Sequence, residues 1–311
     1  KHHVVPVPRD TVAALAARFA GEVGQVDARP DDARARLYDV LMRPLAGEMA
    51  GASALAIVPD RELNQVPFAA LRSSAGGRYL VQDHEVRTVP SAAFFTAAAA
   101  SGSGPHDGGA ALVVGNPTLD ARAARQLPPL PGAAREAESV ARLYGRHSLR
   151  TGASAGRAEV VEQLREHSIF HFAGHAVFNS EQPELSYLAL APGAGNEGTL
   201  HAWEIGRMRL SNVRAVILSA CSTLGPRASR GGPTAGLAYS FLRAGAPATV
   251  STLWDVTDDA TTELLVEFHR RFSAGATASA ALRQAQLRAL ESPRAELRAP
   301  RAWAAFIYTG P

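Results

Sequence analysis

The second half of the chain alternates short apolar runs with amphipathic stretches, and this alternation constrains the fold more than any other feature. Strands are predicted for the apolar runs at 110–115, 168–173, 187–190, 213–220, 248–253 and 304–308. Helices are predicted for the stretches at 132–145, 157–166, 233–243, 257–273 and 277–290. Apolar strands separated by helices are typical of a mostly parallel sheet covered on both faces. We therefore expect an α/β/α sandwich in this half.

The N-terminal part is less regular. Helices are predicted at 10–22 and 32–50, and strands at 55–58, 79–80 and 85–89. The Gly- and Ser-rich segment 101–109 is the best candidate for a boundary. We therefore divide the chain into an N-terminal region, 1–105, and a second lobe, 106–311.

The composition excludes several function classes. Apolar residues make up 46% of the chain and charged residues 20%, as in ordinary globular proteins. No apolar stretch approaches the roughly 20 residues that span a membrane, and the N-terminus has no secretory signal pattern. The net charge of +3 comes from scattered basic residues, so we expect no nucleic-acid partner and no membrane partner. Because the chain begins at Lys1, we interpret it as a fragment or a processed chain.

The chain contains one cysteine, Cys221, which excludes an internal disulfide and argues against a cysteine-based metal site. The lack of disulfides fits a cytoplasmic location. We expect no metal and no other cofactor. A lone cysteine is either a small buried residue or a reactive thiol, so its neighbours decide between the two.

Two predicted strands end in small and polar residues: IFHFAGHA at 169–176 and VILSACST at 216–223. In a parallel sheet both ends lie at the same edge, which would bring His175 near Cys221. An imidazole beside a thiol makes that thiol a nucleophile. The small neighbours Gly174, Ala176, Ala220 and Ser222 would leave backbone N–H groups free to stabilise an oxyanion. The alternative is a buried cysteine and a packed core histidine.

Two other histidines compete for the role of base. His171 lies within the predicted strand, and we expect it to be a packed or supporting residue. His201 is a more distant alternative in a predicted loop.

Several segments resemble the CHAT domain, a bacterial branch of the caspase and separase clan of cysteine peptidases. The resemblance covers about residues 35–311. Its motifs are VPDRELNQVPFAALR (58–72), RYLVQDHEVRTVPSA (78–92), LVVGNP (112–117), LPPLPGAAREAESVARLYG (127–145), HFAGHAVFN (171–179), LSACSTLGP (218–226) and GLAYSFLRAGAPATVSTLWDVTD (236–258).

The resemblance implies a Cys/His dyad, with Cys221 as nucleophile and His175 as base. It also implies an oxyanion hole made by the backbone N–H groups of Cys221 and Ala176. Separases have Gly at the position of Ala176, a change that keeps the backbone N–H. No carboxylate is evident as a third member.

The segment from Trp254 to Asp259 would bind the residue that precedes the scissile bond, P1. In caspases the corresponding segment pairs with the substrate and carries an arginine for acidic P1 residues; here it is acidic and closely resembles separase. A carboxylate can pair with a guanidinium, so we predict a basic P1 residue. Asp255 is the first candidate for that carboxylate and Asp258 the second, with Trp254 beside them. Asp258 could instead cap the following helix.

The resemblance implies a cysteine endopeptidase that cleaves a partner protein, in bacterial defence or regulated cell death. A gasdermin-like pore former is one substrate class, and an upstream repeat or regulatory domain is common in the family. The N-terminal region would be a degenerate caspase-like lobe. The alternatives are a non-catalytic CHAT scaffold and a cysteine-dependent acyltransferase or amidase, which has no sequence support.

Overall fold

The computed structural model describes residues 3–23, 33–73, 77–100, 109–193, 195–220, 236–255 and 258–311. Cys221 lies outside these residues, directly after Ala220. Most of the expected boundary segment, 101–109, also lies outside them.

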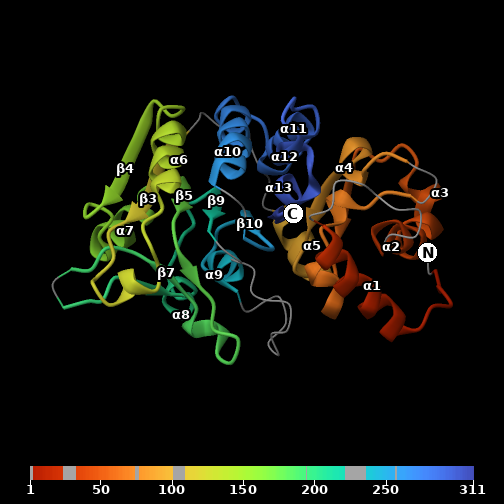
Figure 1. Ribbon diagram of the computed structural model, residues 1–311, viewed down its shortest axis with the longest axis horizontal. Helices are drawn as coiled ribbons and strands as arrows, with labels where there is room; N and C mark the ends of the chain where they lie inside the picture. Colours follow the sequence, from red (N-terminus) through yellow and green to blue (C-terminus); the bar gives the residue numbers. More distant parts are fainter. Residues whose placement is uncertain are drawn as a thin grey trace.

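An eight-stranded sheet forms the centre of the molecule, in the order β1-β2-β11-β10-β9-β5-β3-β4 (Figure 1). Its strands are β1 (Ala54–Ile57), β2 (Glu85–Thr88), β3 (Ala110–Pro117), β4 (Arg146–Gly152), β5 (Ile169–Ala173), β9 (Ala215–Ser219), β10 (Thr249–Thr252) and β11 (Phe306–Thr309). All neighbouring strands pair in parallel except β10 and β11, which are antiparallel. The prediction of a mostly parallel α/β sheet is confirmed.

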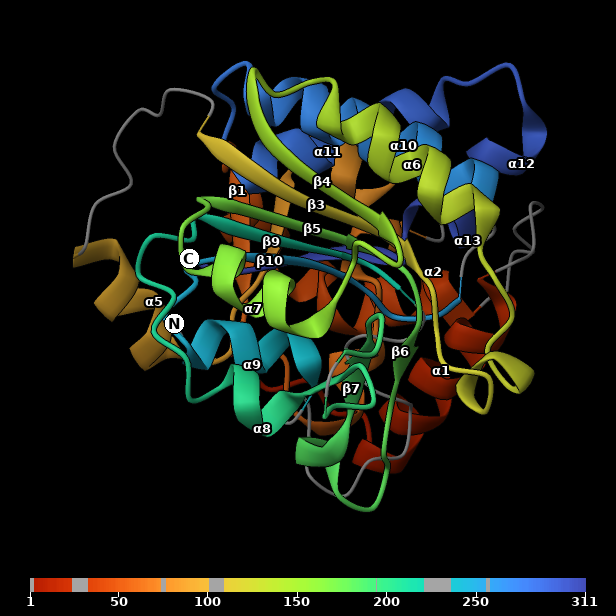
Figure 2. The ribbon, with the colours of Figure 1, turned by 90° about the vertical axis from the view of Figure 1, so that its left-hand side faces the viewer.

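Helices cover both faces of this sheet (Figure 2). One face packs against α6 (Pro131–Ala141), α10 (Asp258–Ser273) and α11 (Ala278–Leu290). The other packs against α7 (Arg157–Leu164), α8 (Ala202–Ile205) and α9 (Leu237–Arg243). Neighbouring strand residues point to opposite faces, so Val113 joins the first core and Leu112 the second. This burial on both sides explains why the central strands are apolar throughout.

A small antiparallel sheet follows the end of β5. It consists of β6 (Ala176–Val177), β7 (Tyr187–Ala189) and β8 (Thr199–His201), in that order. The short helix η5 (Pro183–Leu185) precedes β7, and α8 follows β8. The chain therefore leaves the large sheet at Ala173 and turns directly into a second sheet.

The N-terminal part forms short helices around β1 and β2. They are α1 (Arg9–Glu22), α2 (Ala33–Leu41), η1 (Arg43–Leu45), α3 (Ala46–Met49), η2 (Arg61–Gln65), η3 (Phe68–Ala70), α4 (Leu80–Asp83) and α5 (Ala92–Ala100). The single helix predicted at 32–50 is wrong, since Pro44 cannot donate within a helix and the chain breaks there into three pieces. The strand predicted at 79–80 is also wrong, because Tyr79 forms one isolated bridge to Arg72 and α4 begins at the next residue.

The large sheet extends across the predicted boundary at 105. β2 pairs with β11 through Thr88 and Thr309, and the Arg87 guanidinium donates to the carbonyl oxygen of Pro311 at 3.2 Å. The division into two lobes stays a prediction. Within the described parts of the chain, no helix is both long enough and apolar enough to cross a membrane.

Candidate active site

The ends of β5 and β9 define the candidate site. The two strands pair in parallel up to Ala173 and Ser219, the last residue of each. Beyond this pair, the Gly174 N–H donates to the Ser219 carbonyl oxygen at 3.3 Å. His175 and Cys221 each follow two residues after the last paired position of their own strand.

His175 is half-buried, and a backbone carbonyl fixes its ring. Its Nε2 lies 2.7 Å from the carbonyl oxygen of Pro128, in the segment between β3 and α6. A carbonyl oxygen has no proton to donate, so this contact requires the proton on Nε2. In the neutral ring Nδ1 is then the unprotonated nitrogen, free to accept a proton. Sequence reasoning missed this partner because a backbone carbonyl has no residue-type signature.

The backbone before Cys221 is also held in place. Ala220 is buried, and its carbonyl oxygen accepts a hydrogen bond from the Thr252 hydroxyl on β10. Thr252 is itself buried, at the end of the strand that neighbours β9. The site thus receives support from three adjacent strands, and the contribution of Thr252 was not foreseen.

The pairing of β6 determines where the N–H of Ala176 points. The Ala189 N–H donates to the His175 carbonyl at 2.9 Å, and Ala176 lies opposite Leu188. In an antiparallel ladder this makes Ala176 and Leu188 a non-hydrogen-bonded pair, whose N–H groups point away from each other. The N–H of Ala176 therefore points away from β7.

The residues predicted for the P1 pocket follow β10. Trp254 is partly buried, and its indole Nε1–H donates to the Arg301 carbonyl at 3.0 Å. Asp255 is exposed, and Asp258 is the first residue of α10. The structure thus places Trp254 and Asp255 beyond the carboxyl end of β10, next to the strand that ends before Cys221.

His171 is fully buried on the α6 and α10 side of the sheet, away from solvent. Its Nε2 lies 3.1 Å from Glu136 Oε1 on α6, at ion-pair distance but without the alignment of a hydrogen bond. Its Nδ1 lies 3.0 Å from Nε2 of His269 on α10. His269 Nδ1 in turn lies 2.6 Å from the Tyr144 hydroxyl. His171 is thus packed, as expected, within a buried polar chain whose other members sequence reasoning missed.

Burial and, to a lesser extent, the charge of His171 hold the pKa of His269 well below its ordinary value. Burial raises the pKa of Tyr144. His269 is therefore neutral at physiological pH and bridges Tyr144 and His171. His201, the third histidine considered, contacts the Leu185 carbonyl and the Tyr187 ring within the small sheet.

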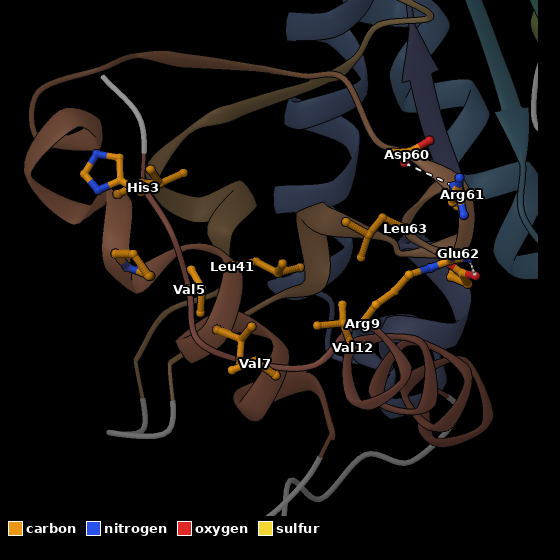
Figure 3. A pocket seen from close by; sticks show the side chains of 13 residues that line it. His3, Val5, Val7, Arg9, Val12, Leu41, Asp60, Arg61, Glu62 and Leu63 are labelled. Carbon is orange, nitrogen blue, oxygen red and sulfur yellow. Dashed lines mark hydrogen bonds and ion pairs between the residues drawn. The ribbon is translucent and has the colours of Figure 1, made fainter.

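A cavity of about 610 Å³ lies elsewhere, among the N-terminal helices (Figure 3). Its apolar lining includes Val5, Leu41 and Leu63, and an ion pair between Arg9 and Glu62 at 2.6 Å lies at its edge. None of the predicted site residues lines it. Among the described residues, no group of three or more His, Asp or Glu side chains could hold a metal ion.

Comparisons with known proteins agree with the motifs. The CHAT domain family model matches residues 31–311. Tetratricopeptide repeat protein 28 of Mus musculus is 28% identical over 335 residues, covering 88% of this chain and 13% of that protein. The Homo sapiens protein of the same name is 26% identical over 327 residues, with the same coverage. The chain therefore spans only 13% of the length of these relatives.

Solved structures with a similar fold are caspase-like peptidases. The complex of Porphyromonas gingivalis RgpB pro- and mature domains has a TM-score of 0.56 and 11% identity, covering 98% of this chain and 77% of that one. The Saccharomyces cerevisiae separase–securin complex has a TM-score of 0.54 and 17% identity, covering 88% of this chain and 17% of that one. At these identities the likeness shows the fold alone, and it confirms the caspase-like α/β architecture.

Proposed function

Since the chain belongs to the CHAT domain family, we propose that it is a cysteine endopeptidase in which His175 activates Cys221. The observation that carries this proposal is the register of β5 and β9. Their parallel pairing ends at Ala173 and Ser219, so both residues follow neighbouring strand ends at the same offset. The caspase-like fold agrees with this assignment.

The proposed reaction begins with proton transfer from the Cys221 thiol to Nδ1 of His175. The thiolate sulfur then attacks the scissile carbonyl carbon, and the carbonyl π electrons move onto oxygen. The N–H groups of Ala176 and Cys221 would stabilise this oxyanion. The direction of the Ala176 N–H, away from β7, supports its part. When the C–N bond breaks, the histidine returns its proton to the leaving amine, and water then hydrolyses the thioester.

The orientation of His175 supports its role as base. The Pro128 carbonyl accepts the Nε2 proton and so selects the tautomer in which Nδ1 can take a proton from the thiol. In serine peptidases a carboxylate does the same for the histidine. A backbone carbonyl would explain why no acidic third member is evident in the sequence.

The substrate is proposed to be a partner protein with a basic P1 residue, led by Arg, bound near Trp254 and Asp255. Asp258 is the second candidate for the carboxylate. The family resemblance favours a role in bacterial defence, with a gasdermin-like pore former as one substrate class. A cytoplasmic location fits this role.

A second candidate function is a non-catalytic scaffold. The relatives are named for tetratricopeptide repeats, and the chain covers 13% of their length, so the matched region is a small part of those proteins. Under either function, we propose that a repeat or regulatory domain is attached to this chain.

Cleavage-site profiling tests the proposed function. The wild type is compared with Cys221→Ala and His175→Ala on a P1 peptide library and on proteins encoded by neighbouring genes. We expect cleavage after Arg or Lys by the wild type and none by either variant. An Arg-chloromethylketone probe should label Cys221 in the wild type. Equal cleavage by all three proteins, or neither labelling nor cleavage by the wild type, would favour the scaffold.

A further inference from the structure

We propose that Asn116 is a positioning residue for His175, acting through the Pro128 carbonyl; this inference rests on the proposed function. The Asn116 side-chain oxygen Oδ1 accepts a hydrogen bond from the Leu130 N–H at 2.8 Å. Leu130 lies two residues after Pro128, whose carbonyl holds Nε2 of His175 at 2.7 Å. Asn116 thus holds the segment that orients the base.

The sequence of this segment makes the Asn116 contact hard to replace. Of the four residues Pro128, Pro129, Leu130 and Pro131, only Leu130 has a backbone N–H. The three proline rings each fix φ near −65°, so the segment is stiff. A hydrogen bond at its one donor therefore fixes the orientation of the Pro128 carbonyl as well.

Leu130 is held from both sides. Its N–H donates to Asn116, and its carbonyl oxygen accepts from the Ala133 N–H at 2.9 Å in the first turn of α6. The start of α6 and the end of β3 therefore fix this residue together. Because both elements pack in the central layers of the fold, the carbonyl of Pro128 is presented from a rigid frame.

Asn116 itself sits at an irregular point of β3. The register with β4 shifts between Gly115 and Pro117, and Asn116 has a φ of 45°, in the left-handed region. Among residues with side chains, Asn and Asp adopt this conformation most readily. Asn therefore satisfies two requirements, a left-handed backbone and an acceptor that reaches Leu130.

The end of β3 also lies close to the turn before His175. A Cβ atom added to Gly174 would lie 3.2 Å from Cδ of Pro117, the residue after Asn116. The end of β3 thus approaches His175 in two ways, through its backbone turn and through the Pro128 carbonyl. Loss of the Asn116 side chain removes only the support of the Pro128 carbonyl and leaves the approach of Pro117 to Gly174 unchanged. An Asn116 variant therefore tests the orientation of the His175 ring separately from the packing of its backbone turn.

Alkylation by iodoacetamide provides the test, because the chain has a single cysteine and the reaction reports on Cys221 alone. An unassisted thiol with a pKa of about 8.5 is only about 3% thiolate at pH 7, so full loss of the base can slow alkylation by about 30-fold. We expect His175→Ala to approach that limit. Asn116→Gly, which keeps the left-handed backbone but lacks the acceptor, should slow alkylation by about three- to tenfold.

Asn116→Asp is the matched control, because it keeps both the acceptor and the backbone preference. Cys221 of this variant should be alkylated at a rate within about twofold of the wild-type rate at about 0.5 M salt, which screens the added charge of the aspartate. At pH 9 all variants should react at similar rates, since the thiol then ionises without a base. Equal melting temperatures would show that the Asn116 variants fold alike.

The outcomes separate the two proposals. If His175→Ala slows alkylation at pH 7 and Asn116→Gly does not, the positioning role is overturned and the dyad stands. If Asn116→Gly slows alkylation by the same factor at pH 7 and pH 9, altered access of iodoacetamide to Cys221 explains the effect, and the positioning role is again overturned. If His175→Ala reacts like the wild type at pH 7, both the dyad and the role of Asn116 are overturned.

Discussion

Replacement of His269 should change how the stability of the protein depends on pH. His269 is completely buried between the Tyr144 hydroxyl and Nδ1 of His171, and its pKa lies well below the ordinary value of 6.5 because burial disfavours its charged form. In the unfolded chain this histidine takes up a proton near pH 6.5, whereas in the folded protein it stays neutral. The unfolded state therefore binds more protons below that pH, and stability falls as the pH falls.

The size of this effect follows from proton linkage. One group contributes up to about 1.4 kcal/mol per pH unit, so the loss attributable to His269 at pH 4.5 is about 2.7 kcal/mol if its folded form has not yet begun to titrate. Above about pH 7.5 the contribution is constant. His269→Gln cannot titrate and should lack this part of the slope.

Two variants separate titration from hydrogen bonding. Glutamine has a donor and an acceptor and can keep both contacts, whereas His269→Phe leaves Tyr144 and His171 each without this partner. The phenylalanine variant should therefore be less stable than the glutamine variant by about 1–3 kcal/mol per unpaired group at every pH. In both variants the free energy of unfolding should depend less steeply on pH than in the wild type, and to the same extent.

Urea unfolding followed by far-ultraviolet circular dichroism between pH 4.5 and 8 measures these quantities. The free energy of unfolding of the wild type minus that of His269→Gln should fall as the pH is lowered from 8 to 4.5, by up to about 2.7 kcal/mol. Parallel curves for the wild type and His269→Gln would refute the conclusion that His269 is buried in its neutral form.

Three further changes test the site. Gly174→Ala should cost about 1–3 kcal/mol of stability and most of the proposed peptidase activity, since the new Cβ would lie 2.9 Å from Cζ of the buried Phe172 ring. A wild-type melting temperature and a wild-type kcat/KM would contradict this. Thr252→Val deprives the buried Ala220 carbonyl of its hydroxyl donor and should lower kcat by about tenfold or more, while Thr252→Ser keeps the wild-type rate. A wild-type rate in Thr252→Val together with a loss in Thr252→Ser would show that the methyl group matters instead. Asp255→Asn should lower kcat/KM for Arg at P1 by about tenfold and leave an uncharged P1 unaffected, measured with paired peptide substrates; an unchanged preference for Arg would exclude Asp255.

The central strands could be predicted from sequence because burial on both faces makes them apolar without interruption. β4 was missed because its sequence, RHSLRTG, has neither an apolar run nor a regular alternation. Among the described strands it lies at the edge of the sheet and pairs with β3 alone, so pairing on one side is enough to hold it. Its tertiary neighbour, not its own residues, determines that it is a strand.

The residues of the candidate site also divide into those that the sequence predicts and those that only the structure reveals. His175 was predicted because it follows a buried strand whose end should lie beside that of the strand before Cys221, and because HFAGHAVFN resembles a CHAT motif. Pro128, Asn116 and Thr252 were not, because their roles depend on contacts between elements far apart in the chain. The buried partnership of His171 with His269 was missed for the same reason: each residue alone fits an ordinary core position.

The position of β11 has a consequence for how the chain acquires its structure during synthesis. β1 and β2 leave the ribosome before the other strands of this sheet, yet among the described strands β2 meets the rest of the sheet through β11, which follows β10 in sequence. Until β11 emerges, β1 and β2 form an isolated pair with an open edge, and two strands alone are marginally stable in water. When β3 to β10 have been synthesised, the N-terminal part of the nascent chain is therefore still unpaired with the rest of the sheet. At this stage a chaperone has most opportunity to bind the chain, and non-native contacts have most opportunity to form.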